Sequence, residues 1–215
     1  MAVFGVTSAG YCGCTDGYAG RTVVAFARKA FAKSRRWRRR LRGEAFAAWV
    51  RLWGGAAGHG ILLDSRLRLR HLPHKGWSLG DGIYFGEGVI LDIRPGAVFS
   101  VGARTKLMHY VIVGAGERVE IGDDCQIAEL TSIRDSDHGV DVAGLISTAP
   151  MSSKAIRIGD NSWVGRGSAL ISGTELGSGV VIGANSVVRS HIPDNSIAVG
   201  APARVVRQRD VPGVN

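Results

Sequence analysis

The chain has little cysteine, little proline and no long apolar run free of charge. It has three cysteines in 215 residues, too few for a disulfide framework, with Cys12 and Cys14 near the start and Cys125 alone. This favours reduced cysteines in a cytoplasmic protein, and the basic segment described below allows a peripheral position at the inner face of the membrane. Paired Cys-x-x-Cys and His-x-x-x-His spacings are absent, so no zinc site and no other metal is expected.

Acidic residues are missing from a strongly basic segment near the start. Residues 21–42 hold ten lysines and arginines, while the whole chain has a formal net charge of +9. The remainder is therefore nearly neutral, and the high net charge does not by itself indicate specific nucleic-acid binding.

The first 72 residues contain no proline, and Phe46, Trp49 and Trp53 follow the basic run. These features predict a basic, aromatic helical segment over 21–58, too charged to span a bilayer. It can cap a neighbouring domain, lie on an anionic membrane surface through 21–53, or contact another polyanion, and these roles are not exclusive. Residues 1–20 show no secretory signal pattern and are expected to be a disordered start.

From residue 158 to 188, an aliphatic residue recurs at every sixth position. A glycine follows four of these residues, and a small hydroxyl residue fills the fifth position of four repeats. This pattern predicts an all-β solenoid, a parallel β-helix in which three repeats form one coil and stacked coils bury the aliphatic side chains. The repeated aliphatic residues are Ile158, Val164, Leu170, Leu176, Ile182 and Val188.

The same period continues upstream but is broken by a long polar stretch. Ile121, Ile127 and Ile133 keep the register, and looser steps extend back to Leu79. We expect the β-helix over 59–208, a loop at 134–157 and a tail at 209–215. Long loops in repeat folds usually lie at the functional face.

That loop carries the histidine of greatest chemical interest. His138 lies beside Asp135 and Asp137 in a polar sequence. Nearby carboxylates can maintain the basicity of a histidine, which makes His138 a candidate general base near neutral pH. The alternative is an ordinary surface histidine on a polar loop.

Several motifs resemble the hexapeptide-repeat acyltransferases, whose fold is a left-handed β-helix. The segments 158–165, 182–188 and 192–196 resemble its repeats, 199–206 resembles its Gly-Ala-Pro-Ala-Arg exit, and Asp135-Ser-Asp-His-Gly139 resembles its catalytic loop, especially in polysaccharide and sugar O-acetyltransferases. The resemblance covers roughly residues 79–208.

The resemblance implies direct transfer of an acetyl group from acetyl-CoA to a hydroxyl. His138 would deprotonate the acceptor, and Glu129 would orient the histidine or hold a sugar hydroxyl. A backbone N–H near the loop or the Trp163–Gly165 turn would stabilise the developing oxyanion. The resemblance also implies a homotrimer with the active site between subunits.

The same resemblance implies residues for CoA and for the acceptor. Small residues would admit the pantetheine chain, and arginines would meet the phosphates. Arg189 and Ser190 depart from the family's Thr-Lys pair at this point. The candidate CoA residues are Trp163, Gly165, Ala184, Arg189, Ser190, Arg204 and Arg207. Candidate acceptor-lining residues are Trp77, Tyr84, His109 and Tyr110, while His191 is expected to be structural.

The acceptor class stays open. A polysaccharide precursor, a lipid-linked oligosaccharide or a nucleotide sugar fits O-acetylation. The alternatives are N-acylation of an amino sugar and a non-catalytic β-helix scaffold. A metal enzyme resembling γ-type carbonic anhydrases would require a third histidine beside His109 and His138, and none is evident.

Overall fold

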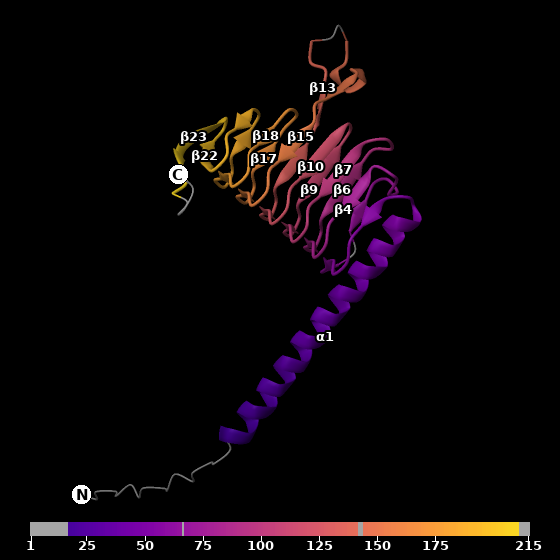
Figure 1. Cartoon of the computed structure of the whole chain (residues 1–215), viewed down its shortest axis with the longest axis vertical. Coiled ribbons are helices and arrows are strands. Elements are labelled where there is room, and N and C mark those ends of the chain that lie inside the picture. The colour runs from indigo at the N-terminus through magenta and orange to yellow at the C-terminus, as the bar shows by residue number, and fades with distance from the viewer. Residues whose placement is uncertain (1–16, 66, 142–143, 211–215) are drawn as a thin grey trace, which may run out of the picture. The chain divides into compact units, whose positions relative to one another are not determined.

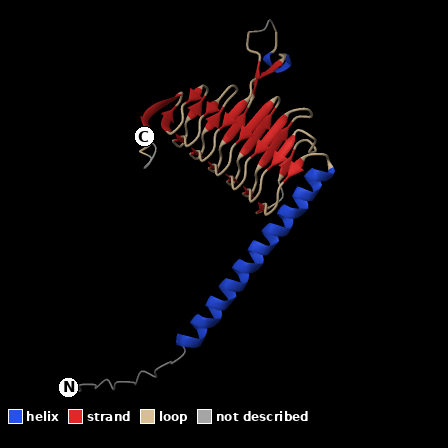
Figure 2. Ribbon diagram, viewed as in Figure 1, coloured by secondary structure: helices blue, strands red, loops and turns tan. Residues whose placement is uncertain are grey.

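The computed structural model describes residues 17–65, 67–141 and 144–210, with side chains from Ser34 onward. Helix α1 (Gly17–Leu52) is followed by a solenoid of short strands (Figures 1 and 2). The first 16 residues of the expected disordered start lie outside the described residues. Residues 17–20 belong to α1, and the helix ends at Leu52 rather than at residue 58.

The internal contacts divide the chain after Arg38, and the last turns of α1 belong to the same unit as the solenoid. The part of α1 before this division is described here only as helix. No helix among residues 17–65, 67–141 and 144–210 is long and apolar enough to cross a membrane.

The solenoid has three parallel faces, because each strand pairs with the strand one coil away. Sheet A contains β1 (Ala56–Ala57), β4 (Trp77–Leu79), β7 (Val98–Val101), β10 (Arg118–Ile121), β15 (Ile156–Ile158), β18 (Glu175–Leu176) and β21 (His191–Ile192). Sheet B contains β2 (Leu62–Leu63), β5 (Tyr84–Phe85), β8 (Lys106–Leu107), β11 (Gln126–Ile127), β16 (Trp163–Val164), β19 (Val181–Ile182), β22 (Ser196–Gly200) and β23 (Ala203–Gln208). Sheet C contains β3 (Arg68–Leu69), β6 (Ile90–Ile93), β9 (Ile112–Ala115), β12 (Ser132–Arg134), β17 (Ala169–Leu170) and β20 (Val187–Val188).

The repeated aliphatic residues form the core, which confirms the predicted β-helix. All six positions from Ile158 to Val188 are at most 3% exposed, and so are the looser upstream positions beginning at Leu79. Stacking is therefore what removes these side chains from water, at about 25 cal/mol for each Å² of apolar surface buried.

The small hydroxyl residues join successive coils where strand pairing stops. The Ser162 hydroxyl donates to the Gly177 carbonyl at 3.1 Å and accepts from the Val180 amide at 3.2 Å. Ser168 repeats the arrangement with Gly183 and Ser186. The fifth position is small and polar because its side chain satisfies corner backbone groups inside the solenoid.

The two ends of the solenoid are covered in different ways. At the first coil, Phe46, Ala47 and Val50 of α1 are buried in the core, and Phe46 meets Phe85 edge-on with ring centroids 6.1 Å apart. At the last coil, β23 folds back antiparallel on β22. The end of α1 therefore covers the first coil and shields apolar side chains that stacking leaves uncovered.

Candidate active site

The polar loop expected at 134–157 leaves the solenoid at the corner between sheets C and A, here called the hairpin corner. It contains β13 (Ser136–His138), the 3₁₀ helix η1 (Ile146–Thr148) and β14 (Met151–Ser153). The two strands pair antiparallel, with His138 opposite Met151. The hairpin projects away from the stacked coils (Figure 1), and His138 is the last residue of its first strand, β13.

Asp135 fastens this hairpin to the preceding coil. Its side chain is fully buried, and its carboxylate accepts hydrogen bonds from the backbone amides of Gly116, Glu117 and Arg118 at 2.7–2.8 Å. The Ser136 hydroxyl adds a fourth at 2.6 Å. A buried carboxylate is stable here because several donors converge on it.

The anchor requires glycine at position 116. A Cβ atom there would lie 2.4 Å from the Ser136 Oγ and 2.6 Å from the Ser153 Oγ. These two hydroxyls lie 3.0 Å apart and join the start of β13 to the end of β14. The base of the hairpin is thus a closed polar cluster tied to the corner of the coil beneath it.

His138 itself is exposed, and so is Asp137. Within the described residues, no hydrogen bond or ion pair joins His138 to Asp135 or Asp137. The four hydrogen bonds of Asp135 go elsewhere, so the structure places this carboxylate at the base of the hairpin and not against the imidazole. An exposed imidazole can receive a proton from a ligand that approaches from solvent.

Two arginines near the hairpin were missed by the sequence analysis. The Arg94 guanidinium lies 2.8 Å from the Met151 Sδ, on the strand opposite His138. Together with Asp92 and Arg134, these residues line a small cleft of about 40 Å³. No local signal marks Arg94, because Met151 follows it by 57 residues in the chain and the two meet only when the coils have stacked.

Glu129 lies at a different corner, between sheets B and C, here called the slot corner. Its carbonyl accepts from the Gly167 amide at 2.9 Å, and its neighbour Leu130 donates to the His109 carbonyl at 3.1 Å. Its side chain is half-buried. Within one copy of the chain, sheet C separates Glu129 from the corner that carries His138.

Three expected CoA residues do come together. Gly165 and Ala184 follow neighbouring strands of sheet B at the slot corner, and a Cβ on Gly165 would lie 2.6 Å from the Ala184 nitrogen. Trp163 is exposed on β16, the strand that ends directly before Gly165. The corner is therefore a narrow backbone surface with an aromatic ring on the neighbouring face.

The remaining expected CoA residues are divided between two places. Arg204 and Arg207 are exposed on β23, at the end of sheet B. Arg189 and Ser190 lie between β20 and β21, at the hairpin corner, and are exposed as well. The seven residues thus do not form one cluster in a single copy.

One sequence expectation is wrong, and one of the two places expected for the oxyanion donor loses two of its amides. Trp77 is 1% exposed and packs edge-on against Phe99, so it is a core residue and lines no groove. The amides of Trp163 and Gly165 donate to carbonyls of the next coil at 2.8 Å, which leaves neither free for an oxyanion. Both differences arise from stacking, which pairs the backbone N–H groups with carbonyls of the next coil and buries the inward-facing side chains.

The other expected acceptor residues have defined positions. Tyr84 donates to Asp64 at 2.6 Å and belongs to the contact between α1 and the first coil. His109 accepts from the Glu87 amide at 2.9 Å through Nδ1, and Tyr110 is exposed beside it at the slot corner. His191 is exposed on sheet A, 3.9 Å from Glu175.

His191 ends a row of alternating charges along sheet A. Glu120 receives hydrogen bonds from Arg118 at 2.8 Å and Arg157 at 3.0 Å, and Arg157 also reaches Glu175 at 3.3 Å. Burial raises the pKa of Glu120, but the two arginines outweigh this effect and hold it below the usual range. The row borders a groove of about 500 Å³ on this face.

The sequence is similar to those of known bacterial transferases. Residues 155–190 match the family described as bacterial transferase hexapeptide, six repeats. Over 139 residues, the chain is 32% identical to the putative lipopolysaccharide biosynthesis O-acetyl transferase WbbJ of Escherichia coli K12. The matched region covers 61% of this chain and 71% of that protein. The chain belongs to the hexapeptide-repeat acetyltransferase family.

A second family member shares more identity over a smaller part of its length. A probable acetyltransferase of Mycobacterium tuberculosis is 43% identical over 155 residues, covering 72% of this chain and 50% of that protein. The chain therefore spans about half of this relative.

Two solved structures share the fold. A maltose O-acetyltransferase from Clostridium difficile is 26% identical with a TM-score of 0.50, covering 75% of this chain and 73% of that chain. An N-acyltransferase from Bacillus cereus, in complex with dTDP and 3-hydroxybutyryl-CoA, has a TM-score of 0.64 at 19% identity over 75% of this chain and 87% of that one. At this identity the second likeness concerns the fold alone.

Proposed function

We propose that this chain is an acetyl-CoA-dependent acetyltransferase that modifies a hydroxyl of a sugar, in the synthesis of a polysaccharide or lipid-linked oligosaccharide. The observation that carries the proposal is the exposed His138, held on an anchored hairpin in a member of the hexapeptide-repeat acetyltransferase family. The similarity to the lipopolysaccharide biosynthesis O-acetyl transferase of Escherichia coli and to the maltose O-acetyltransferase of Clostridium difficile supports a sugar hydroxyl as the acceptor.

His138 acts as the general base in this proposal. Its imidazole takes the proton from the acceptor hydroxyl, which then attacks the carbonyl of the donor thioester. The bound acetyl-CoA supplies an activated acetyl group and a thiolate leaving group. His138 returns its proton to that sulfur, so the imidazole ends neutral and no acyl-enzyme is required.

The slot corner fits the pantetheine arm of the donor. Packing of the next coil requires glycine at 165, and Ala184 beside it is small and exposed, so neither residue projects a bulky side chain at this corner. Arg204 and Arg207 present exposed cations at the end of the same sheet, where they can pair with the donor's phosphates.

A complete site requires a second copy of the chain. His138 projects from the hairpin corner, whereas Gly165 and Ala184 lie at the slot corner, on the other side of sheet C. In the proposed homotrimer, the hairpin of one copy meets the slot corner of its neighbour. This arrangement unites residues that the solenoid of one copy separates.

The test combines donor binding with turnover. We expect calorimetry to show micromolar binding of acetyl-CoA to the wild-type protein and to His138→Ala. We expect His138→Ala to lower kcat on a responsive sugar by at least ~100-fold, the scale of a lost general base. His59→Ala is the matched control, because His59 is exposed on the first coil, and its kcat should equal that of the wild type.

Each result has a definite meaning. Loss of activity with retained binding supports His138 as the base. Full activity of His138→Ala would assign the proton transfer to another residue, and absence of acetyl-CoA binding in all three proteins would favour a non-catalytic scaffold. Acetylation of an amino sugar but of no hydroxyl would replace O-transfer by N-transfer.

A further inference from the structure

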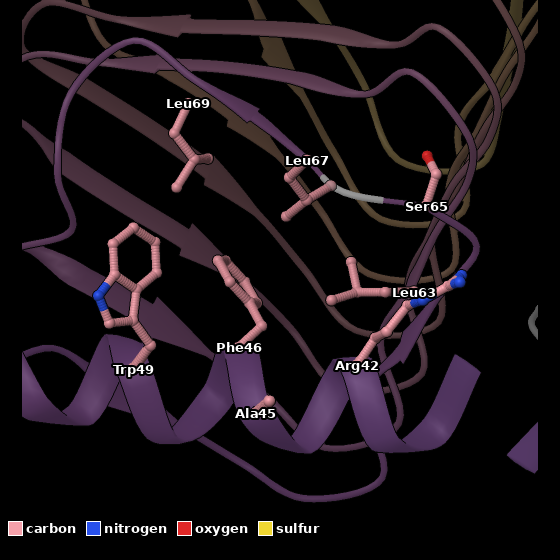
Figure 3. Close-up of a pocket in the computed structure, with 8 residues that line it drawn as sticks. All are labelled: Arg42, Ala45, Phe46, Trp49, Leu63, Ser65, Leu67 and Leu69. Atoms are coloured by element: carbon pink, nitrogen blue, oxygen red, sulfur yellow. The ribbon is translucent and has the colours of Figure 1, made fainter. Parts of the chain in front are cut away.

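A cavity of about 450 Å³ lies between the last turns of α1 and the first coil of the solenoid. One wall comes from the helix and the other from the segment leading into sheet C (Figure 3). Its volume falls within the range of about 300–1,000 Å³ that small-molecule sites occupy. The residues lining it are Arg42, Ala45, Phe46, Trp49, Leu63, Ser65, Leu67 and Leu69.

The two ends of this cavity differ in polarity. Figure 3 shows the rings of Phe46 and Trp49 rising from the helix toward Leu67 and Leu69 on the opposite wall, with the Arg42 side chain at one end. The Arg42 Nη1 donates to the Asp64 carbonyl, which engages one of the five N–H groups of a guanidinium. A ligand that fills the cavity therefore has an apolar body and an anionic end.

The helix surface beside the cavity is apolar and exposed. Leu41 and Leu52 are 49% and 81% exposed, and the alanines at 45 and 48 are exposed between them. Spacings of four, three and four residues place these side chains on one stripe of the helix. Ala45 belongs both to this stripe and to the cavity lining, so the stripe leads into the cavity.

Arginines predominate beside the stripe, and the one acidic residue of α1, Glu44, is half-buried and accepts from the Gly60 amide at 2.8 Å. Arg40 and Arg42 are exposed next to it, and no acidic residue occurs from 21 to 43. Arginines flanking an apolar helix surface suit an interface with anionic lipid, where the apolar side chains enter the headgroup layer. A purely aliphatic ligand would leave this charge unmatched.

We propose that this cavity binds the acyl chain of an anionic phospholipid, with Arg42 contacting the phosphate. The chain lies between the rings of Phe46 and Trp49 and the leucines of the opposite wall. The proposal goes beyond acetyl transfer and does not depend on it, because the cavity lies at the first coil, whereas Gly165 and Ala184 follow the fifth and sixth strands of sheet B. A lipid held here places the capped end of the solenoid at the membrane surface.

The probe is monomeric lysophosphatidylglycerol, used below its micelle-forming concentration and measured by calorimetry with the full chain. Binding to intact vesicles would not distinguish the cavity from the rest of the helix, since an arginine-rich helix binds any anionic surface through charge alone. We expect saturable binding with one lipid for each chain.

Two alanines of α1 make a matched pair for the cavity. Ala45→Trp places an indole in the cavity, whereas Ala48→Trp places the same side chain on the exposed stripe outside the lining. We expect Ala45→Trp to weaken lysolipid binding by at least about tenfold, because the acyl chain loses most of its buried methylenes. Ala48→Trp should bind as the wild type does.

Two arginines make a second pair, for the headgroup. Arg42→Gln should reduce the preference for lysophosphatidylglycerol over lysophosphatidylcholine by about tenfold, the scale of a lost charge-assisted contact. Arg40→Gln should keep the preference, since Arg40 is exposed but does not line the cavity.

Several outcomes would overturn the proposal. Equal binding by Ala45→Trp and Ala48→Trp would remove the cavity as the site. Absence of saturable lysolipid binding would mean that the cavity is closed to lipid or filled by another part of the chain. Self-association that Ala45→Trp abolishes in the absence of lipid would assign the cavity to a second copy.

Discussion

At the scale of single residues, the most consequential side chain of the hairpin is Asp135 and not its neighbour Asp137. Both were candidates for tuning His138, since all three lie within four positions of sequence. The structure separates them by burial: Asp135 is enclosed and accepts four hydrogen bonds, while Asp137 is exposed. One carboxylate therefore supports the hairpin, and the other remains accessible near the imidazole.

Asp135→Asn should destabilise the protein and loosen the hairpin. An amide NH₂ group would replace one acceptor oxygen and face backbone donors, and leaving buried amides unpaired costs about 1–3 kcal/mol. Chemical denaturation measures the loss of unfolding free energy, and limited proteolysis within residues 139–150 measures the loosening.

Asp137→Asn is the control for this change. It makes the same substitution on an exposed side chain of β13. Its unfolding free energy should therefore stay within about 0.5 kcal/mol of the wild-type value, and its proteolysis rate should equal that of the wild type. Equal behaviour of the two variants would contradict the anchoring role of Asp135.

At the scale of elements, the last turns of α1 have two faces with different tasks. Phe46, Ala47 and Val50 enter the core of the first coil, and Leu41 and Leu52 remain exposed. The buried face is held further by an ion pair between Arg39 and Asp64. A cap is needed because the first coil has no preceding coil to cover its apolar side chains.

Phe46→Ala should weaken this cap strongly. Removing the ring leaves a cavity against Phe85 and Trp49, and such truncations of buried aromatic residues cost about 3–5 kcal/mol. Denaturant unfolding measures the cost. Leu52→Ala, on the exposed face of the same helix, should change stability by less than about 0.5 kcal/mol.

A comparable loss from both variants would show that the helix is stabilised by features other than the buried face. A loss confined to Phe46→Ala would tie the stability of the first coil to the packing of α1.

At the scale of the whole molecule, the three-sided solenoid separates the proposed base from the proposed donor slot. Position along the coil decides the corner at which a residue lies, and His138 and Ala184 occupy different corners. No bending of one chain removes this separation, because stacked coils pair throughout all three sheets. Assembly of copies is the remaining way to unite them.

Mixed oligomers test this arrangement. His138→Ala removes the base, and Ala184→Trp blocks the slot corner from an exposed position, so each protein alone should be nearly inactive. Each proposed site takes His138 from one subunit and Ala184 from its neighbour. In equal co-expression, about one neighbouring pair in four has both residues intact, so about a quarter of the wild-type activity per subunit should return.

Activity that stays absent in verified mixed oligomers would place the whole site within one copy. A protein that light scattering finds to be monomeric at assay concentrations would remove the shared site altogether.

The repeat pattern predicted the core well but the site less completely. Buried positions such as Ile158 and Val188 follow from period alone, because alternation between inside and outside is a local property of each short strand. The projecting position of His138 followed from the break in that period. Trp77 was misplaced because the alternation was not applied there: Leu79 faces the core, and a residue two positions earlier on the same strand faces the same side.

The sequence by itself determined the solenoid, its buried aliphatic positions, the basic helix and the place where the polar hairpin interrupts the repeats. Only the tertiary structure decided that Asp135 supports the hairpin, that Arg94 reaches Met151, that the amides of Trp163 and Gly165 are already paired, and that the proposed base and the proposed donor slot lie at different corners. The reason is physical. Periodicity reports the environment of each residue along one strand, whereas contacts between coils join residues tens of positions apart, and those appear only when the coils stack.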